Sequence, residues 1–247
     1  MQRLKWRGGA GIVVALIALG CCLVLPSKPP LPIDKIIDIS WPNCSLNIVS
    51  AQWGIVGTTG GLDLRPNKCL VSEVVGIHHY SLYMNTGYPG ISYAEKFAKS
   101  PWSCRTLDEA CLAYNYGYNA SLYAINYASL NDIHSNLWWL DVETDNSWSS
   151  FSALNRASLQ GSIDAIRHTV ILASVGIYSY PSQWQTITDN WHNGLPAWVA
   201  TGSSDFSAAS LACSGLSFNG GQVWLGQYTS GLDYDYPCSP HFFQAIL

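Results

Sequence analysis

The chain has 247 residues, of which 48% are hydrophobic, 13% aromatic and only 11% charged. The charged fraction is less than half of the roughly 25% that is typical of globular domains, yet the high hydrophobic content excludes disorder for most of the chain. The net charge is −4 and the 12 basic residues are scattered, which argues against a nucleic-acid partner.

The N-terminal segment has the pattern of an export signal. Arg3, Lys5 and Arg7 precede an uncharged run over residues 8–26, which is typical of a secretory signal or a signal anchor. The run is close to the roughly 20 residues that span a bilayer, so cleavage and retention as an anchor both stay open. A proline-rich spacer completes residues 1–32. We expect residues 33–247 to be secreted or held in the cell envelope, with membrane contact only through the N-terminal segment.

The cysteine count agrees with export, because an even number of cysteines in an exported chain indicates disulfides. Neighbours in sequence suggest three local bridges, namely Cys44–Cys69, Cys104–Cys111 and Cys213–Cys238. No pair of cysteines has metal-ligand spacing and no histidine is placed to complete a site, so neither a metal nor another cofactor is expected.

Short apolar runs that are rich in β-formers alternate with helix-like stretches along the body. The expected strands are residues 35–40, 53–59, 80–86, 137–144, 174–180, 196–202 and 222–230. The expected helices cover residues 108–129 and 153–169, and another begins near Pro181. This alternation predicts an α/β fold with a parallel sheet. Seven or eight strands in about 215 residues favour a single TIM-type (β/α) barrel, with irregular or missing helices, over a doubly wound sheet.

Carboxylates follow several of these predicted strands. Asp38 lies near the end of the first run, Asp141 and Glu143 close the run LWWLDVET, and Asp233 and Asp235 follow the last run. In a TIM-type barrel the active site lies at the carboxyl ends of the strands, so these acids are the candidate catalytic residues.

The pair Asp141-x-Glu143 is the most specific of these signals. Residues two apart on a strand point to the same face, roughly 6–7 Å apart. Two carboxylates held that close in a partly desolvated site repel, so one of them keeps a proton near neutral pH. A proton-holding acid beside an ionised carboxylate is the arrangement that cleaves glycosidic bonds. The simpler interpretation is that both side chains cap the next helix.

Five segments resemble the glycoside hydrolase family 25 lysozymes, which cut peptidoglycan, and they occur in the family's order. The segments are DISW, LWWLDVE, VGIYSYPSQW, PAWVA and GQYTSG with the acid pair that follows it, and together they span residues 36–238. The wider sequence resembles a branch of this family found in exported bacterial proteins. The resemblance implies a barrel and a peptidoglycan or related glycan as partner.

The resemblance also implies roles for the acids. Glu143 is then the general acid and Asp141 assists by orienting the substrate's N-acetyl group. Asp38 and one C-terminal aspartate tune the site and bind substrate; Asp233 and Asp235 both remain candidates, with Asp235 preferred. The second predicted strand departs from the family, because Thr58 and Thr59 stand where the family carries an acid.

Aromatic residues near the predicted strand ends are candidates for sugar contact, because aromatic faces match the apolar faces of sugars. They are Trp41, Tyr83, Tyr178, Trp198 and Tyr228. The simpler interpretation is that many of them belong to the core.

Two functions are therefore expected from the sequence. The first is an exported muramidase-like glycoside hydrolase that acts on peptidoglycan. The second is a non-catalytic glycan-binding or envelope protein that has kept the barrel and lost turnover, as the missing second-strand acid allows.

Overall fold

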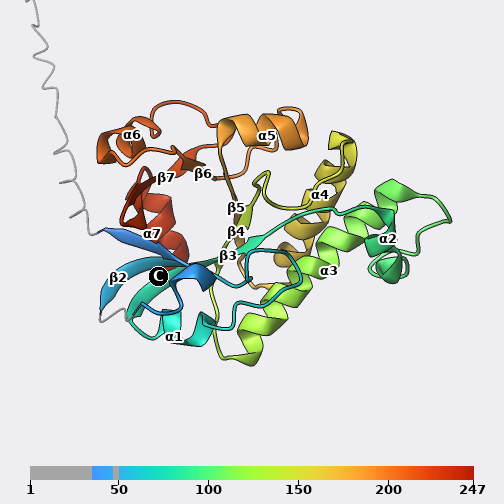
Figure 1. The fold of residues 1–247 in the computed structure, drawn as a ribbon, viewed down its shortest axis with the longest axis horizontal. Coiled ribbons are helices and arrows are strands. Elements are labelled where there is room, and N and C mark those ends of the chain that lie inside the picture. The colour runs from blue at the N-terminus through green and yellow to red at the C-terminus, as the bar shows by residue number, and fades with distance from the viewer. Residues whose placement is uncertain (1–34, 47–49) are drawn as a thin grey trace, which may run out of the picture. The chain divides into compact units, whose positions relative to one another are not determined.

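A computed structural model describes residues 35–46 and 50–247 (Figure 1). The expected signal or anchor over residues 1–32 lies outside the described residues, so its fate and the domain boundary at residue 33 stay predictions. Among the residues that the structure describes, no helix is both long and apolar enough to cross a bilayer.

Eight strands close into one barrel in sequence order. They are β1 (Ile36–Ile39), β2 (Ala51–Gly57), β3 (Ile77–Asn85), β4 (Leu137–Asp141), β5 (Ser174–Ser179), β6 (Ala197–Ala200), β7 (Val223–Ser230) and β8 (Leu232–Pro237). Strands β1 to β7 pair in parallel with their neighbours, whereas β8 runs antiparallel to both β7 and β1. The barrel expected from the sequence is confirmed, but the expectation of an all-parallel sheet is wrong at β8.

Helices occupy most of the connections between the strands. They are η1 (Trp41–Asn43), α1 (Leu70–Val74), α2 (Ile91–Ala94), η2 (Glu95–Phe97), α3 (Glu109–Leu130), α4 (Ser152–Thr169), α5 (Pro181–Thr188), α6 (Phe206–Leu211) and α7 (Pro240–Ile246). The long α3 and α4 agree with the expected helices within about one residue at each end. The remaining helices are short, as the expectation of irregular helices allowed.

Alternation along the strands separates two cores. One face of each strand fills the barrel interior, where Trp139 and Trp198 are buried together with Ile36 and Phe242. The opposite face packs beneath the helices, where Trp138 contacts the core of α3 and α4. Adjacent residues such as Trp138 and Trp139 therefore serve different cores, as the period of two in a strand requires.

Helices α3 and α4 pack closely because small residues line their contact. A Cβ atom at Gly117 would overlap the backbone carbonyl of Ser158, and one at Gly161 would overlap the carbonyl of Tyr114. Ser162 donates a hydrogen bond to the carbonyl oxygen of Gly117 at 3.1 Å. This close approach holds the two helices against the outer face of β3, β4 and β5.

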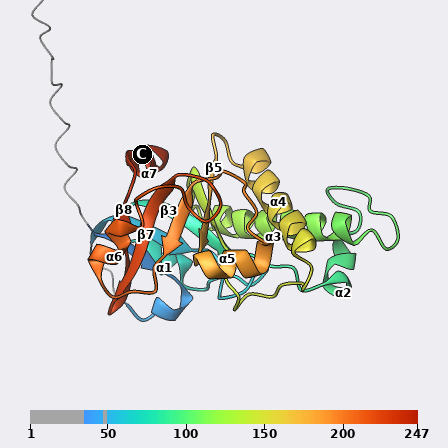
Figure 2. The same cartoon turned by 90° about the horizontal axis from the view of Figure 1, so that it is seen from above.

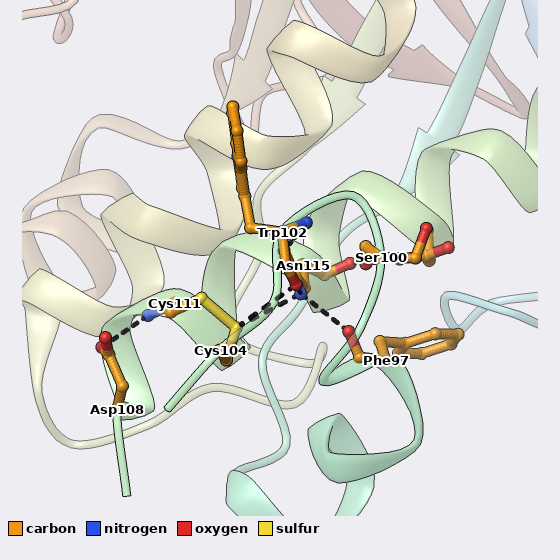
Figure 3. Close-up of a disulfide and its surroundings, with 8 residues drawn as sticks. Phe97, Ser100, Trp102, Cys104, Asp108, Cys111 and Asn115 are labelled. Atoms are coloured by element: carbon orange, nitrogen blue, oxygen red, sulfur yellow. Dashed lines mark hydrogen bonds between the residues drawn. A yellow bond between two sulfur atoms is a disulfide. The ribbon is translucent and has the colours of Figure 1, made fainter. Parts of the chain in front are cut away.

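The three disulfides join the pairs expected from the sequence. The bridge Cys104–Cys111 ties the loop before α3 to the first turn of that helix (Figure 3). Beside it, the side-chain amide of Asn115 donates to the carbonyl oxygens of Phe97 and Trp102, both at 2.7 Å. Three bridges within one domain are typical of proteins that fold in an oxidising, extracellular compartment.

The two ends of the barrel differ. Helix α7 lies at the end opposite to the tip of the β7 arrow in Figure 2, which is the end where the parallel strands begin. Phe242 of α7 is fully buried in the interior core, and Phe243 packs edge-on against Trp53. This helix therefore closes the amino-terminal end, and the other end, where the parallel strands finish, carries the acids.

Candidate active site

The four most deeply placed acids of the sequence analysis come from three strands of the barrel. Asp38 lies on β1, Asp141 ends β4, Glu143 follows β4, and Asp235 lies on β8. Their charges act on one another: the negative charge of Glu143 contributes to raising the pKa of Asp38 and of Asp141. The structure thus brings together, at one end of the barrel, residues separated by almost 200 positions in sequence.

Asp141 is held in a fixed position by amides. Its Oδ2 accepts a hydrogen bond from the side-chain amide of Asn85 at 2.6 Å, and Asn146 approaches Oδ1 at 3.4 Å. Burial raises the pKa of Asp141 well above its usual value, the neighbouring Glu143 raises it further, and the bond from Asn146 lowers it. The carboxyl group is therefore ordered, desolvated and close to a second acid.

Glu143 has a different environment although it lies only two residues further on. Its side chain is half-buried, and its carboxyl group accepts no hydrogen bond from another described side chain. Burial raises the pKa of Glu143 to about 6, and the charges of Asp145 and Asp233 add to this effect. A carboxyl with that pKa can give up a proton at near-neutral pH and is free to turn toward a ligand.

Asp38 belongs to a chain of hydrogen bonds across the barrel interior. Gln227 of β7 donates to its Oδ2 at 2.8 Å, and the hydroxyl of Tyr178 of β5 donates to the Oε1 of Gln227 at 2.8 Å. The other oxygen of Asp38 is buried without a hydrogen-bond partner among the described residues. Burial and the nearby Asp233 raise the pKa of Asp38 well above its usual value.

The two C-terminal acids occupy different depths. Asp235 is 2% exposed, and its Oδ1 accepts a 2.6 Å hydrogen bond from the indole of Trp198. Asp233 pairs in register with Asp38, is partly exposed, and accepts a hydrogen bond from Thr229 at 2.6 Å. After burial, the charge of Asp233 contributes to raising the pKa of Glu143 and of Asp38, whereas the pKa of Asp235 is itself raised by burial and then by the charge of Asp38. The register therefore places Asp233 nearer to the open end and Asp235 one layer below it, and both remain candidates for the site.

The five aromatic residues expected to contact sugar do not form one surface. Trp41 is 49% exposed, next to Gly61 of the loop after β2, and is the member with an open face. Tyr83 and Tyr178 line the interior close to Asp38 and Asp141.

The other two aromatic residues lie away from the open end. Trp198 is 1% exposed, and its indole donates a hydrogen bond to Asp235. Tyr228 is a correction: its ring faces away from the barrel interior, stacked on Tyr234 and packed edge-on against Phe206 of α6. The alternation of β7 explains this, because the preceding Gln227 is the residue that points inward.

Other polar residues of the site were missed by the sequence analysis. Asn85, Asn146 and Gln227 hold the carboxylates, and Tyr180 lies close enough to Glu143 and Asp233 for their charges to raise its pKa, after burial as the main cause. The available signal was position, because Asn85, Tyr180 and Gln227 each lie near the carboxyl end of an expected strand.

A hollow of about 670 Å³ is lined by residues of the segments that follow β2, β3 and β4, and none of the five acids lines it. Aromatic side chains of Tyr93, Tyr116 and Trp148 line it together with Asp63 and Lys96. Trp148 connects it to the acids, because its indole donates a 2.8 Å hydrogen bond to the backbone carbonyl of Glu143.

Comparison with known proteins agrees with this geometry. Residues 109–206, which include Asp141 and Glu143, match the family model described as lysozyme-like protein 1. Within that segment, which runs from the start of α3 to the start of α6, the chain is similar to lysozyme-like proteins. Comparison with curated proteins gave no match.

Solved structures share the fold of this chain. A muramidase from Trichobolus zukalii superposes with a TM-score of 0.52 at 13% identity, over 86% of this chain and 97% of its own. A glycosyl hydrolase 25 virulence factor of Streptococcus pneumoniae, GHIP, gives 0.51 at 16% identity, over 87% and 93%. The modular autolysin LytC of Streptococcus pneumoniae gives 0.50 at 17% identity, over 82% of this chain and 45% of its own.

The residues after β2 carry no acid next to Asn85, and a hydroxyl group contacts Asn85 there. Thr59 follows β2, its hydroxyl donates to the Oδ1 of Asn85 at 2.8 Å, and the backbone N–H of Asn85 donates to that hydroxyl at 2.9 Å. Asn85 in turn donates to Asp141. A neutral relay, Thr59 to Asn85 to Asp141, thus links β2, β3 and β4.

Proposed function

We propose that this chain is a glycoside hydrolase that cleaves the glycan strands of peptidoglycan at the bond after N-acetylmuramic acid. The observation that carries the proposal is that the two carboxyl groups at the end of β4 have different environments. Asp141 is buried and held by amides, whereas Glu143 is half-buried, its carboxyl group accepts no side-chain hydrogen bond from the described residues, and its pKa is raised to about 6. When two neighbouring carboxyl groups have environments that differ in this way, one of them can act as the general acid while the other orients or stabilises the substrate.

In the proposed reaction Glu143 donates its proton to the glycosidic oxygen as that bond breaks, so the leaving sugar departs as a neutral alcohol. Asp141 orients the N-acetyl group of the substrate, whose carbonyl oxygen stabilises the positive charge that develops at the anomeric carbon. A water molecule then adds to that carbon and returns a proton to Glu143. The cycle balances as hydrolysis, without any cofactor.

The remaining acids support this step from fixed positions. Asp233, at the open end, raises the pKa of Glu143 by its charge, and Asp38 acts on Asp141 in the same sense. Asp235 lies beneath, buried against Trp198, and its pKa is raised by burial and by the charge of Asp38. We assign Asp233 to substrate contact and Asp235 to tuning of the acids beneath the open end.

The extended substrate fits the shape of the open end. Trp41 offers a half-exposed aromatic face next to Gly61, and the neighbouring residues Leu62 and Asp63 line the hollow that also contains Tyr93 and Trp148. Aromatic side chains of this kind contact the apolar faces of sugars. We therefore propose that sugars next to the scissile bond bind along the loop after β2.

The test is digestion of purified peptidoglycan followed by mass spectrometry of the reduced products. The proposal predicts fragments that end in reduced N-acetylmuramic acid, and none from Glu143→Gln. The exposed Glu95→Gln variant is the matched control and is expected to behave like the wild type. Fragments ending in reduced N-acetylglucosamine would refute the assigned bond.

The second candidate is a glycan-binding protein without turnover, which the missing acid after β2 favours. Binding alone predicts that insoluble peptidoglycan sediments the chain but yields no new reducing ends. Under that reading wild type and Glu143→Gln sediment equally and neither produces fragments.

A further inference from the structure

The amino-terminal end of the barrel carries exposed aliphatic side chains on neighbouring loops. Leu130, the last residue of α3 before the connection to β4, is 85% exposed. Ile171 and Leu172, in the connection from α4 to β5, are 84% and 86% exposed. Val75, before β3, is 81% exposed. Each of these loops precedes a strand, so they all lie at the end opposite to the acids.

These loops border two adjoining hollows. One, of about 280 Å³, is lined largely by apolar side chains, including Ile133, Trp138 and Ile171. The other, of about 350 Å³, is lined by the three imidazoles of His78, His79 and His134. The two share the segment 134–136, so an apolar recess lies directly beside a polar one. That pairing suits a molecule with an apolar tail and a polar head group.

Leu172 is also placed in an unfavourable backbone conformation. Its φ is +57°, a region that glycine and asparagine adopt more readily than leucine. A side chain that gains little from burial and strains its own backbone is kept for some purpose other than the stability of the isolated fold. Leu107 shares this conformation, with φ +67° and 82% exposure, but lies before α3, away from this group of loops.

The chain also enters the barrel at this end. Residues 8–26 form an uncharged apolar run, and residues 27–34 separate it from Lys35 at the start of β1. Eight residues reach at most about 29 Å when fully extended. If the apolar run is retained as an anchor, this spacer limits the distance between the bilayer surface and the start of β1.

We infer that this end of the barrel, defined as the docking face by Val75, Leu130, Ile171 and Leu172, rests on a phospholipid bilayer. The aliphatic side chains enter the interfacial region, and the histidine-lined hollow receives a lipid head group. This extends the expectation from the sequence, which assigned membrane contact to the N-terminal segment alone. Docking in this orientation directs Glu143 away from the membrane.

The test separates the docking face from the anchor. Residues 33–247 contain the whole closed barrel, both cores and all three disulfides, and form one compact unit, so this fragment is suited to the experiment. The measurement is its co-sedimentation with vesicles of phosphatidylcholine containing phosphatidylglycerol. We expect measurable partitioning that falls at least tenfold in the triple variant Leu130→Ser, Ile171→Ser, Leu172→Asn.

The matched control is Leu107→Asn, which removes an equally exposed leucine from an equally strained position. Asparagine tolerates positive φ, so neither Leu172→Asn nor Leu107→Asn should unfold the barrel. Partitioning by Leu107→Asn is expected to equal that of the unmodified fragment. No partitioning by the unmodified fragment, or an equal loss in the control, would overturn the inference. Self-association of the fragment that Leu172→Asn abolishes, without vesicle binding, would assign the face to a second copy instead.

Discussion

Two carboxyl groups on one strand end differ because their surroundings differ, and this contrast is the basis of the proposed chemistry. The carboxyl group of Asp141 accepts hydrogen bonds from the side-chain amides of Asn85 and Asn146. The carboxyl group of Glu143 is half-buried and accepts no side-chain hydrogen bond from the described residues. The spacing D-x-E predicted that the two would lie together. Which of them is bonded could not be predicted, because it depends on amides supplied by other segments.

The pKa of Glu143 predicts a pH profile. A general acid works in its protonated form, so kcat/KM should fall as the pH rises through about 6. After burial, the charge of the exposed Asp145 is the largest cause of the raised pKa, so Asp145→Asn should move this limb to lower pH. Initial rates of reducing-end release between pH 4 and 8 measure the shift. If kcat/KM falls at the same pH in Asp145→Asn as in the distant control Asp132→Asn, the assignment of this pH dependence to Glu143 is contradicted.

Asp235 predicts a stability effect with a defined sign. Burial raises its folded-state pKa above the unfolded value, so its favourable contribution is complete at acidic pH and is lost as the pH rises through the folded pKa. Asp235→Asn removes this loss while its side-chain oxygen can still accept from Trp198. We expect the variant to be more stable than wild type at pH 7, because asparagine carries no charge that must be buried.

Urea unfolding at pH 4 and pH 7 checks this sign. The difference between Asp235→Asn and wild type should shrink toward pH 4. A variant that is less stable at pH 7 would show that the ionised Asp235 stabilises the fold, contrary to its burial against Trp198.

At the scale of elements, the ends of β2, β3 and β4 are joined by the relay from Thr59 through Asn85 to Asp141. The sequence showed only that the expected acid after β2 is missing. It could not show that Asn85 replaces the link, because asparagine is common at strand ends and its partner lies 56 residues away.

The relay predicts graded effects on turnover. Thr59→Val removes the hydroxyl that both donates to and accepts from Asn85, so Asp141 loses its fixed position and kcat should fall roughly tenfold, the effect of about 1.4 kcal/mol on the barrier. Thr59→Ser keeps the hydroxyl and should restore most of the rate. The positioning role further requires that KM change less than kcat. Equal rates for the valine and serine variants would show that the Thr59 hydroxyl does not position Asp141 for turnover.

The disulfides differ in the length of loop that they close, which predicts their relative contributions. Cys104–Cys111 closes a separation of 7 residues, and Cys213–Cys238 one of 25. Chain-entropy arguments give about 2.5 kcal/mol for the shorter loop and about 3.5 kcal/mol for the longer one. The two double-serine variants, compared by urea unfolding, should show the larger loss for Cys213 and Cys238. The reverse order would show that packing around Asn115 matters more than loop length.

The strands and long helices could be predicted because their hydrophobic patterns are strong. Strand β8 was missed because LDYDYP carries two inward acids and follows β7 after the single residue Gly231, so it looks like a loop in the sequence. The inward position of Asp233 and Asp235 is decided by pairing with β1 and β7, which no local pattern encodes.

The whole molecule is polarised along the barrel axis. The acids lie where the parallel strands end, whereas the exposed aliphatic loops, helix α7 and the entry of the chain lie where they begin. The sequence predicted a barrel from the alternation of elements and an export signal from the first 26 residues. It could not predict that the aliphatic residues of distant loops share one end, because that follows from closure of the sheet.

The central claim is that Glu143 supplies the proton for glycan cleavage, and the most direct measurement is reducing-end release from purified peptidoglycan at pH 5. Loss of a general acid typically costs a factor of 10² to 10⁴ in rate. We therefore predict a rate at least 100-fold lower for Glu143→Gln than for wild type, with an unchanged unfolding midpoint, and a wild-type rate for Glu95→Gln. A Glu143→Gln variant that is folded and retains the wild-type rate would contradict the claim.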